Sequence, residues 1–203
     1  MNIFAFLMPP LIGLTPQVTQ GQFPGTTKDH RRTVFVGWHD EMDSRSNWST
    51  LDMQNKAFVA QPIPGTVFLG LDRVPANWPY SYQWSGVTQV ANVDVARYPI
   101  LMSRVRQVQG YAHLDIDVLG PKGEVINTLR SATLNNPGLS TIDLSQVLAP
   151  AFYRLRLRLI VGGPNEGCCA TYDWVRFVDK GDAEFLTLNP DWDRVRQYGL
   201  SLR

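Results

Sequence analysis

Residues 153–161 read Tyr-Arg-Leu-Arg-Leu-Arg-Leu-Ile-Val, and this stretch decides the fold class. Apolar and arginine side chains alternate with a period of two, so a strand here buries one face and exposes the other. A shift of one residue would bury three guanidinium groups, which places the leucines inside and the arginines outside. A turn-rich loop follows at residues 162–167, and residues 169–178 return as a second extended run. We therefore expect half-buried antiparallel strands.

The composition is that of one large β-sandwich with many strands and turns. The chain has 203 residues, of which 44% are hydrophobic, with 16 Gly and 14 Pro. A chain of this length buries roughly 70% of its unfolded surface, so its core needs no disulfide or metal ion. The formal net charge of +1, with both signs spread along the chain, argues against nucleic acid as the main partner.

Short strands are predicted at even spacing along most of the chain, which is typical of a sandwich or barrel. Besides the two runs above, they are residues 34–38, 57–61, 66–69, 90–95, 100–108, 111–119, 124–129 and 140–144.

A helix is expected only near the C-terminus. There Asn189 can cap residues 191–196 and Pro190 suits the first turn. The predicted organisation is an apolar leader and extended linker at residues 1–32, a β-sandwich domain at 33–188, and a short C-terminal helix or tail at 189–203.

Five segments carry a family resemblance. They are a Tyr-Pro dipeptide followed by a hydrophobic strand within residues 94–105, then residues 114–118, an Ile-Asp-Leu-Ser turn within 141–145, residues 155–161, and an Asp-Trp-Val strand within 172–177. Their order resembles the galactose-binding-like jelly roll of many carbohydrate-binding modules. The resemblance implies an all-β fold, an antiparallel β-sandwich with an extended N-terminal arm and a short C-terminal helix. It also implies a sugar ligand.

An aromatic row is the first candidate binding surface. Trp78, Tyr80, Tyr82 and Trp84 alternate with other residues, so an extended backbone sets four rings on one face over about 20 Å. Such a row can stack on sugar rings or lie at a protein or lipid interface. The alternative is that these rings pack under the sandwich.

A structural calcium ion is the second candidate. Galactose-binding-like modules often hold calcium near the first and last strands, and the resemblance places Asp173 in the closing strand. Asp40, Glu41 and Asp43 form an acidic cluster with hard oxygen donors. The alternative is an ordinary exposed acidic loop, because no twelve-residue calcium loop is present.

The N-terminal leader is a candidate partner-docking element. Residues 1–14 contain ten apolar residues besides two prolines, and no Lys or Arg precedes Lys28. The run is too short to span a bilayer, and it lacks the basic region of a signal peptide. We expect its large apolar side chains to insert into a partner protein or the adjacent lipid; these are Phe4, Phe6, Leu7, Leu11 and Ile12. The alternative is an uncleaved export signal.

The remaining motifs favour structural roles. If the strands are neighbours, Arg154, Arg156 and Arg158 can pair across them with Asp115 and Asp117, and the alternative is a patch for an acidic partner or anionic headgroups.

Catalytic and zinc motifs are missing from the sequence. His39 lies beside Asp40 without a nucleophile elbow, zinc helix or phosphate loop, so no enzyme activity is predicted. Cys168 and Cys169 are adjacent, and packing residues or a strained vicinal disulfide both remain open.

Two functions follow. The first is a non-catalytic accessory subunit, an extracytoplasmic β-sandwich in the periplasm or on the cell surface that is docked on a larger membrane-associated protein assembly through its N-terminal arm. The alternative is an extracytoplasmic carbohydrate-binding module. The leader favours the first function, and the family resemblance favours the second.

Overall fold

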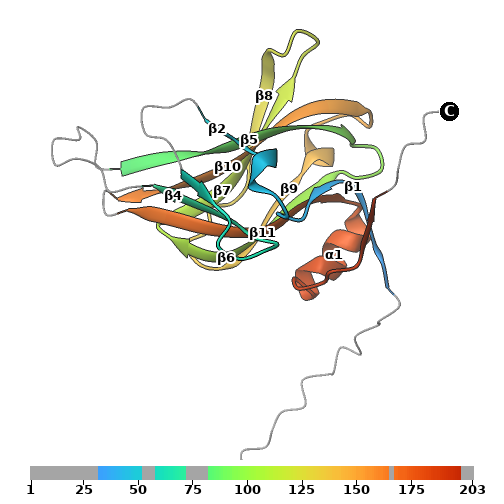
Figure 1. The fold of residues 1–203 in the computed structure, drawn as a ribbon. Coiled ribbons are helices and arrows are strands. Elements are labelled where there is room, and N and C mark those ends of the chain that lie inside the picture. The colour runs from blue at the N-terminus through green and yellow to red at the C-terminus, as the bar shows by residue number, and fades with distance from the viewer. Residues whose placement is uncertain (1–31, 52–57, 72–81, 165–166, 198–203) are drawn as a thin grey trace, which may run out of the picture. The chain divides into compact units, whose positions relative to one another are not determined.

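The computed structural model describes residues 32–51, 58–71, 82–164 and 167–197, and these residues form two β-sheets, one α-helix and two short 3-10 turns (Figure 1). The strands are β1 (Val34–Asp40), β2 (Ser49–Thr50), β3 (Phe58–Ala60), β4 (Val67–Leu71), β5 (Tyr82–Asp94), β6 (Ile100–Gln109), β7 (Tyr111–Leu119), β8 (Val125–Arg130), β9 (Gly138–Asp143), β10 (Phe152–Pro164), β11 (Cys168–Val178) and β12 (Val195–Gln197). The helix is α1 (Lys180–Leu188), and the 3-10 turns are Arg45–Asn47 and Leu144–Gln146.

The strand order is that of a jelly roll. The five-stranded sheet has the order β2-β5-β10-β7-β8. In the seven-stranded sheet, β11 pairs with β1 and β4 along one side and with β6 along the other. Strand β9 pairs with β6 in the same sheet. Four antiparallel pairs are nested along the chain, β1 with β11, β5 with β10, β6 with β9, and β7 with β8. An eight-stranded pattern of this kind, split between two packed sheets, defines the jelly roll. The predicted fold class is confirmed.

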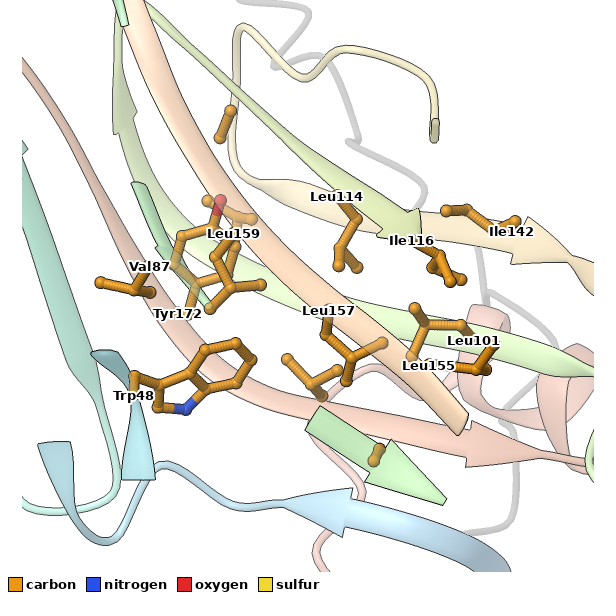
Figure 2. Packing of buried hydrophobic residues seen from close by; sticks show 14 of the residues in the cluster. Trp48, Val87, Leu101, Leu114, Ile116, Ile142, Leu155, Leu157, Leu159 and Tyr172 are labelled. Carbon is orange, nitrogen blue, oxygen red and sulfur yellow. The ribbon is translucent and has the colours of Figure 1, made fainter. Parts of the chain in front are cut away.

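The core lies between the sheets and follows the alternation seen in the sequence. Leu155, Leu157 and Leu159 of β10 are fully buried and face the neighbouring sheet. Figure 2 shows them packed with Leu114 and Ile116 of β7 and with residues of the other sheet. Each such side chain contributes about 1.5 to 3 kcal/mol by leaving water. The predicted register of this strand is therefore confirmed.

A second, smaller apolar cluster joins α1 to the outside of the seven-stranded sheet. Ala183 and Leu186 of the helix pack with Val34, Val36 and Trp174. Asp179 begins the helix because its side chain accepts a hydrogen bond from the backbone N–H of Asp182. In Figure 1 the helix lies beside the strands β1 and β11.

The predicted position of the C-terminal helix is wrong. Asn189 ends a helix instead of beginning one, since its backbone N–H donates to the carbonyls of Phe185 and Leu186. Residues 195–197 form β12, which pairs in parallel with β1. Tertiary pairing thus overrides the local capping signal in this segment.

The other predicted strands are present, with the predicted ends at residues 111–119 and shifted ends elsewhere. The largest difference is β5, which begins at Tyr82 where the sequence predicted a start at residue 90. The two runs that flank the loop at 162–167 belong to different sheets, because β10 pairs with β5 and β7 while β11 pairs with β1, β4 and β6.

Candidate functional site: the outer face of the five-stranded sheet

The side of the five-stranded sheet that points away from the core carries the candidate site. Because β10 buries its odd-numbered leucines, its even-numbered side chains lie on the opposite side. Paired residues share a face, so even-numbered residues of β5 and odd-numbered residues of β7 lie there too. We call this surface the outer face.

Two aromatic residues flank Gly162 at one end of the outer face. Gly162 of β10 is opposite Trp84 of β5 on one side and Tyr111 of β7 on the other. Strands β5 and β7 flank β10 and are therefore separated by about 10 Å, twice the strand spacing. A methyl group at Gly162 would overlap the Cζ atom and hydroxyl of Tyr111, so the Tyr111 ring lies across this glycine. Trp84 is 43% exposed. We call Trp84 and Tyr111 the aromatic platform.

His113 lies beside the aromatic platform with unused hydrogen-bonding groups. Its ring stacks on Tyr111 with centroids 5.8 Å apart and an interplanar angle of 13°. The residue is buried, and neither ring nitrogen has a hydrogen-bond partner among the described residues. Burial lowers the pKa of His113, Asp115 opposes that shift, and the charges of Arg130 and Arg158 add to it. A neutral imidazole carries one donor and one acceptor, and in His113 both are shielded from solvent.

An ion-pair belt continues from His113 along the outer face. Asp115 is bound by Arg130 through two hydrogen bonds of 2.8 and 3.1 Å, and Arg158 lies 3.4 Å from it. Asp117 accepts hydrogen bonds of 2.8 Å from both Arg156 and Arg158. The predicted cross-strand pairing is therefore confirmed for Arg156 and Arg158. We call these three arginines and two aspartates the ion-pair belt.

Arg154 extends the belt without joining it. The residue is exposed on β10, opposite Asn92 of β5 and Leu119 of β7. The residues opposite Arg154 therefore lack a carboxylate, whereas Arg156 and Arg158 pair with Asp115 and Asp117.

The predicted aromatic row is described only in part. Trp84 lies on the outer face, and the backbone of Tyr82 continues the same strand. Trp78 and Tyr80 lie outside the described residues. Sequence reasoning missed Tyr111 and His113, because only the pairing of β7 with β10 brings them to this end of the sheet.

The predicted calcium ligands hold protein donors instead. Asp40 accepts from the backbone N–H of Met42 and the indole of Trp48, and Glu41 is bound by Arg176. Arginines 104 and 106 both contact Asp173. Asp43 is exposed. Across the described ranges, no group of three or more His, Cys, Asp and Glu side chains could hold a metal ion. Calcium binding stays a prediction.

The remaining predictions concern the N-terminal leader and the two cysteines. The leader residues Phe4, Phe6, Leu7, Leu11 and Ile12 lie outside the described residues. No helix in the described part of the chain is long and apolar enough to cross a membrane. Cys168 and Cys169 are both free thiols, and burial raises the pKa of each.

Two hollows lie elsewhere on the described surface. One of about 640 Å³ is lined by Arg104, Arg106 and Asp191, among others, and Arg104 is already paired with Asp173 and Asp191. The other, of about 340 Å³, lies between the β5–β6 turn and the start of α1. Neither contains an exposed aromatic ring.

Comparisons with known proteins return similar folds at low identity. No family model matches the chain, and no curated protein matches its sequence. A solved structure of carbohydrate-binding modules from the β-sandwich superfamily has a TM-score of 0.46 and 11% identity, covering 71% of this chain and 60% of that chain. The module CsCBM6-3 from Clostridium stercorarium, in complex with cellobiose, has a TM-score of 0.39 and 14% identity over 74% and 99%.

A third similar structure is the enzymatically active domain of tailspike protein 4 from bacteriophage CBA120. Its TM-score is 0.43 and its identity 12%, covering 68% of this chain and 20% of that chain. The chain thus spans 60% of the first structure and one fifth of the tailspike domain.

Proposed function

We propose that the protein binds a carbohydrate on the outer face, with Trp84 and Tyr111 stacking against sugar rings. A pyranose ring has one face of C–H groups and an edge of hydroxyl groups, so it suits a site that joins aromatic rings to hydrogen-bonding groups. The aromatic platform supplies the rings at one end of the sheet. The exposure of Trp84 leaves its ring accessible to a ligand.

The observation that carries the proposal is the exposed Trp84 ring beside Tyr111, with the ion-pair belt on the same face. The exposed guanidinium groups of Arg130 and Arg156 can donate hydrogen bonds to sugar hydroxyls. The ring nitrogens of His113 have no hydrogen-bond partner among the described residues, but they are buried and a surface ligand does not reach them. An apolar protein or lipid surface on the same platform would cover the charged groups without pairing them, so a glycan fits this face better than a membrane does.

The accessory-subunit role predicted from the leader rests on residues outside the described part of the chain. It stays a prediction, as do the membrane-associated assembly and the periplasmic or cell-surface location. A non-catalytic role also stays a prediction. Glycan binding on the outer face is compatible with either an isolated module or a subunit of a larger assembly.

Affinity gel electrophoresis tests the proposal. Wild-type protein is run through gels containing galactomannan, xylan, hydroxyethyl cellulose or polygalacturonate, beside a gel without polysaccharide. We expect at least one polysaccharide to retard the wild type, and Trp84→Ala to abolish the retardation. Trp84 is 43% exposed, so the same change should shift the melting temperature little.

The matched control is Phe58→Ala. Phe58 is an aromatic residue of similar exposure, 46%, on the seven-stranded sheet. This variant should be retarded like the wild type. Retardation that survives Trp84→Ala, or no retardation in any gel, would contradict the proposal.

A further inference from the structure

We propose that the glycan bound on the outer face is anionic and carries the carboxylate groups of uronic acid units. This inference rests on the proposed function and names the class of ligand for the same site. It follows from which charged groups of the outer face are exposed to a ligand and which are buried.

The negative charges of the ion-pair belt are hidden beneath the positive ones. The side chains of Asp115 and Asp117 are only 1% and 2% exposed. The arginine side chains above them are far more accessible, at 60% for Arg130, 37% for Arg156 and 19% for Arg158. A ligand that reaches the belt therefore meets hydrogen-bond donors and positive charge.

Arginines also outnumber aspartates on the strands of the five-stranded sheet. Strands β5, β7, β8 and β10 carry four arginines and three aspartates, because Arg154 joins the belt arginines and Asp94 joins the belt aspartates. Asp94 is opposite Phe152, at the far end from Trp84, and accepts a hydrogen bond from the backbone N–H of Ala96. Between Trp84 and Arg154, four positive charges thus face two buried negative ones.

The belt lies close enough to the aromatic platform for one oligosaccharide to contact both. Asp115 is four residues from Tyr111 on β7, so the belt begins about 13 Å along the strand from the platform. The exposed arginines of the belt, Arg130 and Arg156, would then face sugar units beyond the platform. The Nε of Arg158 and both ring nitrogens of His113 have no hydrogen-bond partner in the described part of the chain, but they are buried and a surface ligand does not contact them directly.

A carboxylate suits this arrangement for a geometric reason. The planar guanidinium group can bind a planar carboxylate through two parallel hydrogen bonds, and the charges strengthen both. A neutral glycan would accept hydrogen bonds from the exposed arginines but would gain nothing from their charge. Nucleic acid also combines rings with charge, but the whole chain has a formal charge of only +1.

A matched pair of polysaccharides tests the inference. Wild-type protein is titrated with polygalacturonate and with the same polymer after methyl esterification, which removes the charge and keeps the backbone. A chelator is present to prevent gelation by calcium. We expect the ester to bind about tenfold more weakly or worse. Binding of the charged polymer should fall as sodium chloride rises from about 0.02 to about 0.5 M, because salt screens exposed charges.

Two variants of equal charge change provide the control. Arg130→Gln removes an exposed charge of the belt and leaves Asp115 in contact with Arg158, so binding of polygalacturonate should weaken about two- to fivefold. Lys180→Gln removes a charge of similar exposure, 63%, at the start of α1 on the other sheet, and should bind like the wild type. Melting curves confirm that both variants are folded.

The outcomes separate this inference from the proposed function. Equal binding of the ester and the charged polymer, with Trp84→Ala still abolishing both, would overturn the anionic ligand and keep the glycan site. If Trp84→Ala binds polygalacturonate as tightly as the wild type, the binding is non-specific adsorption by charge. That result would overturn both the anionic ligand and the glycan site. Tighter binding of an oligothymidylate than of polygalacturonate would replace the glycan by single-stranded nucleic acid and also overturn both.

Discussion

His113 shows how the environment of one residue connects stability with binding. The imidazole stacks on Tyr111, lies 3.6 Å from Asp115, and faces the charges of Arg130 and Arg158. Burial is the largest effect on its pKa and lowers it. The ring is therefore held neutral in the folded protein at a pH where an unfolded chain would begin to protonate it.

This environment predicts a pH dependence. A histidine whose pKa is lowered by folding stabilises the protein above its unfolded pKa, near 6.5, and that contribution is lost as the pH falls through the folded value. The free energy of unfolding of the wild type should thus decrease between about pH 7.5 and about pH 5.5. In His113→Gln the decrease should be smaller. Urea denaturation at both pH values measures the free energy of unfolding. If the decrease in His113→Gln equals that of the wild type, His113 does not titrate as described.

At the scale of elements, the strands of the outer face show what the sequence could and could not predict. The alternation of arginine and leucine in β10 was sufficient to place both faces of that strand. The pairing that sets Tyr111 opposite Gly162 joins residues far apart in the sequence, and no local pattern encodes it. The helix was misplaced for the same reason, because β12 pairs with β1 and the capping signal of Asn189 applies at the end of α1.

The contact of Tyr111 with Gly162 can be tested by a small change. In Gly162→Ala the added methyl group would overlap the Tyr111 ring and approach the Gln83 carbonyl oxygen, so the ring must move. We expect a destabilisation of about 1 to 3 kcal/mol and weaker glycan binding. Chemical denaturation and affinity electrophoresis measure the two effects.

Gly138→Ala is the matched control for this change. At Gly138 the nearest heavy atom to an added methyl group is 3.7 Å away, which is ordinary contact. This variant should behave like the wild type in both measurements. If the two variants are indistinguishable, the Tyr111 ring does not lie across Gly162.

For the whole molecule, the nested strand pairs place one core between the two sheets and leave the outer face of the smaller sheet outside that core. Composition and strand spacing predicted the sandwich, and five short segments resembled the jelly roll. Neither indicated that Asp115 and Asp117 would be buried under arginines. That arrangement depends on three neighbouring strands, β10, β7 and β8, and emerges only from their register.

One core predicts one cooperative transition. Leu157 is fully buried among residues of both sheets, so Leu157→Ala should lower the free energy of unfolding by about 2 to 5 kcal/mol without changing the denaturant slope. Val147 is 53% exposed, and Val147→Ala should change the stability by no more than about 0.5 kcal/mol. Urea unfolding, monitored by fluorescence and by circular dichroism, measures the stability of both variants and the number of transitions. Two separate transitions would contradict a single shared core.

Nuclear magnetic resonance can locate a bound glycan on the outer face of the five-stranded sheet. Isotope-labelled protein is titrated with a short oligogalacturonate, and the chemical shifts of assigned residues are followed. We predict that the largest changes fall on the Trp84 indole, Tyr111, His113 and the guanidinium group of Arg158. Changes that cluster instead around Arg104 and Arg106 on the seven-stranded sheet, with the outer face unperturbed, would show that the glycan does not bind the outer face.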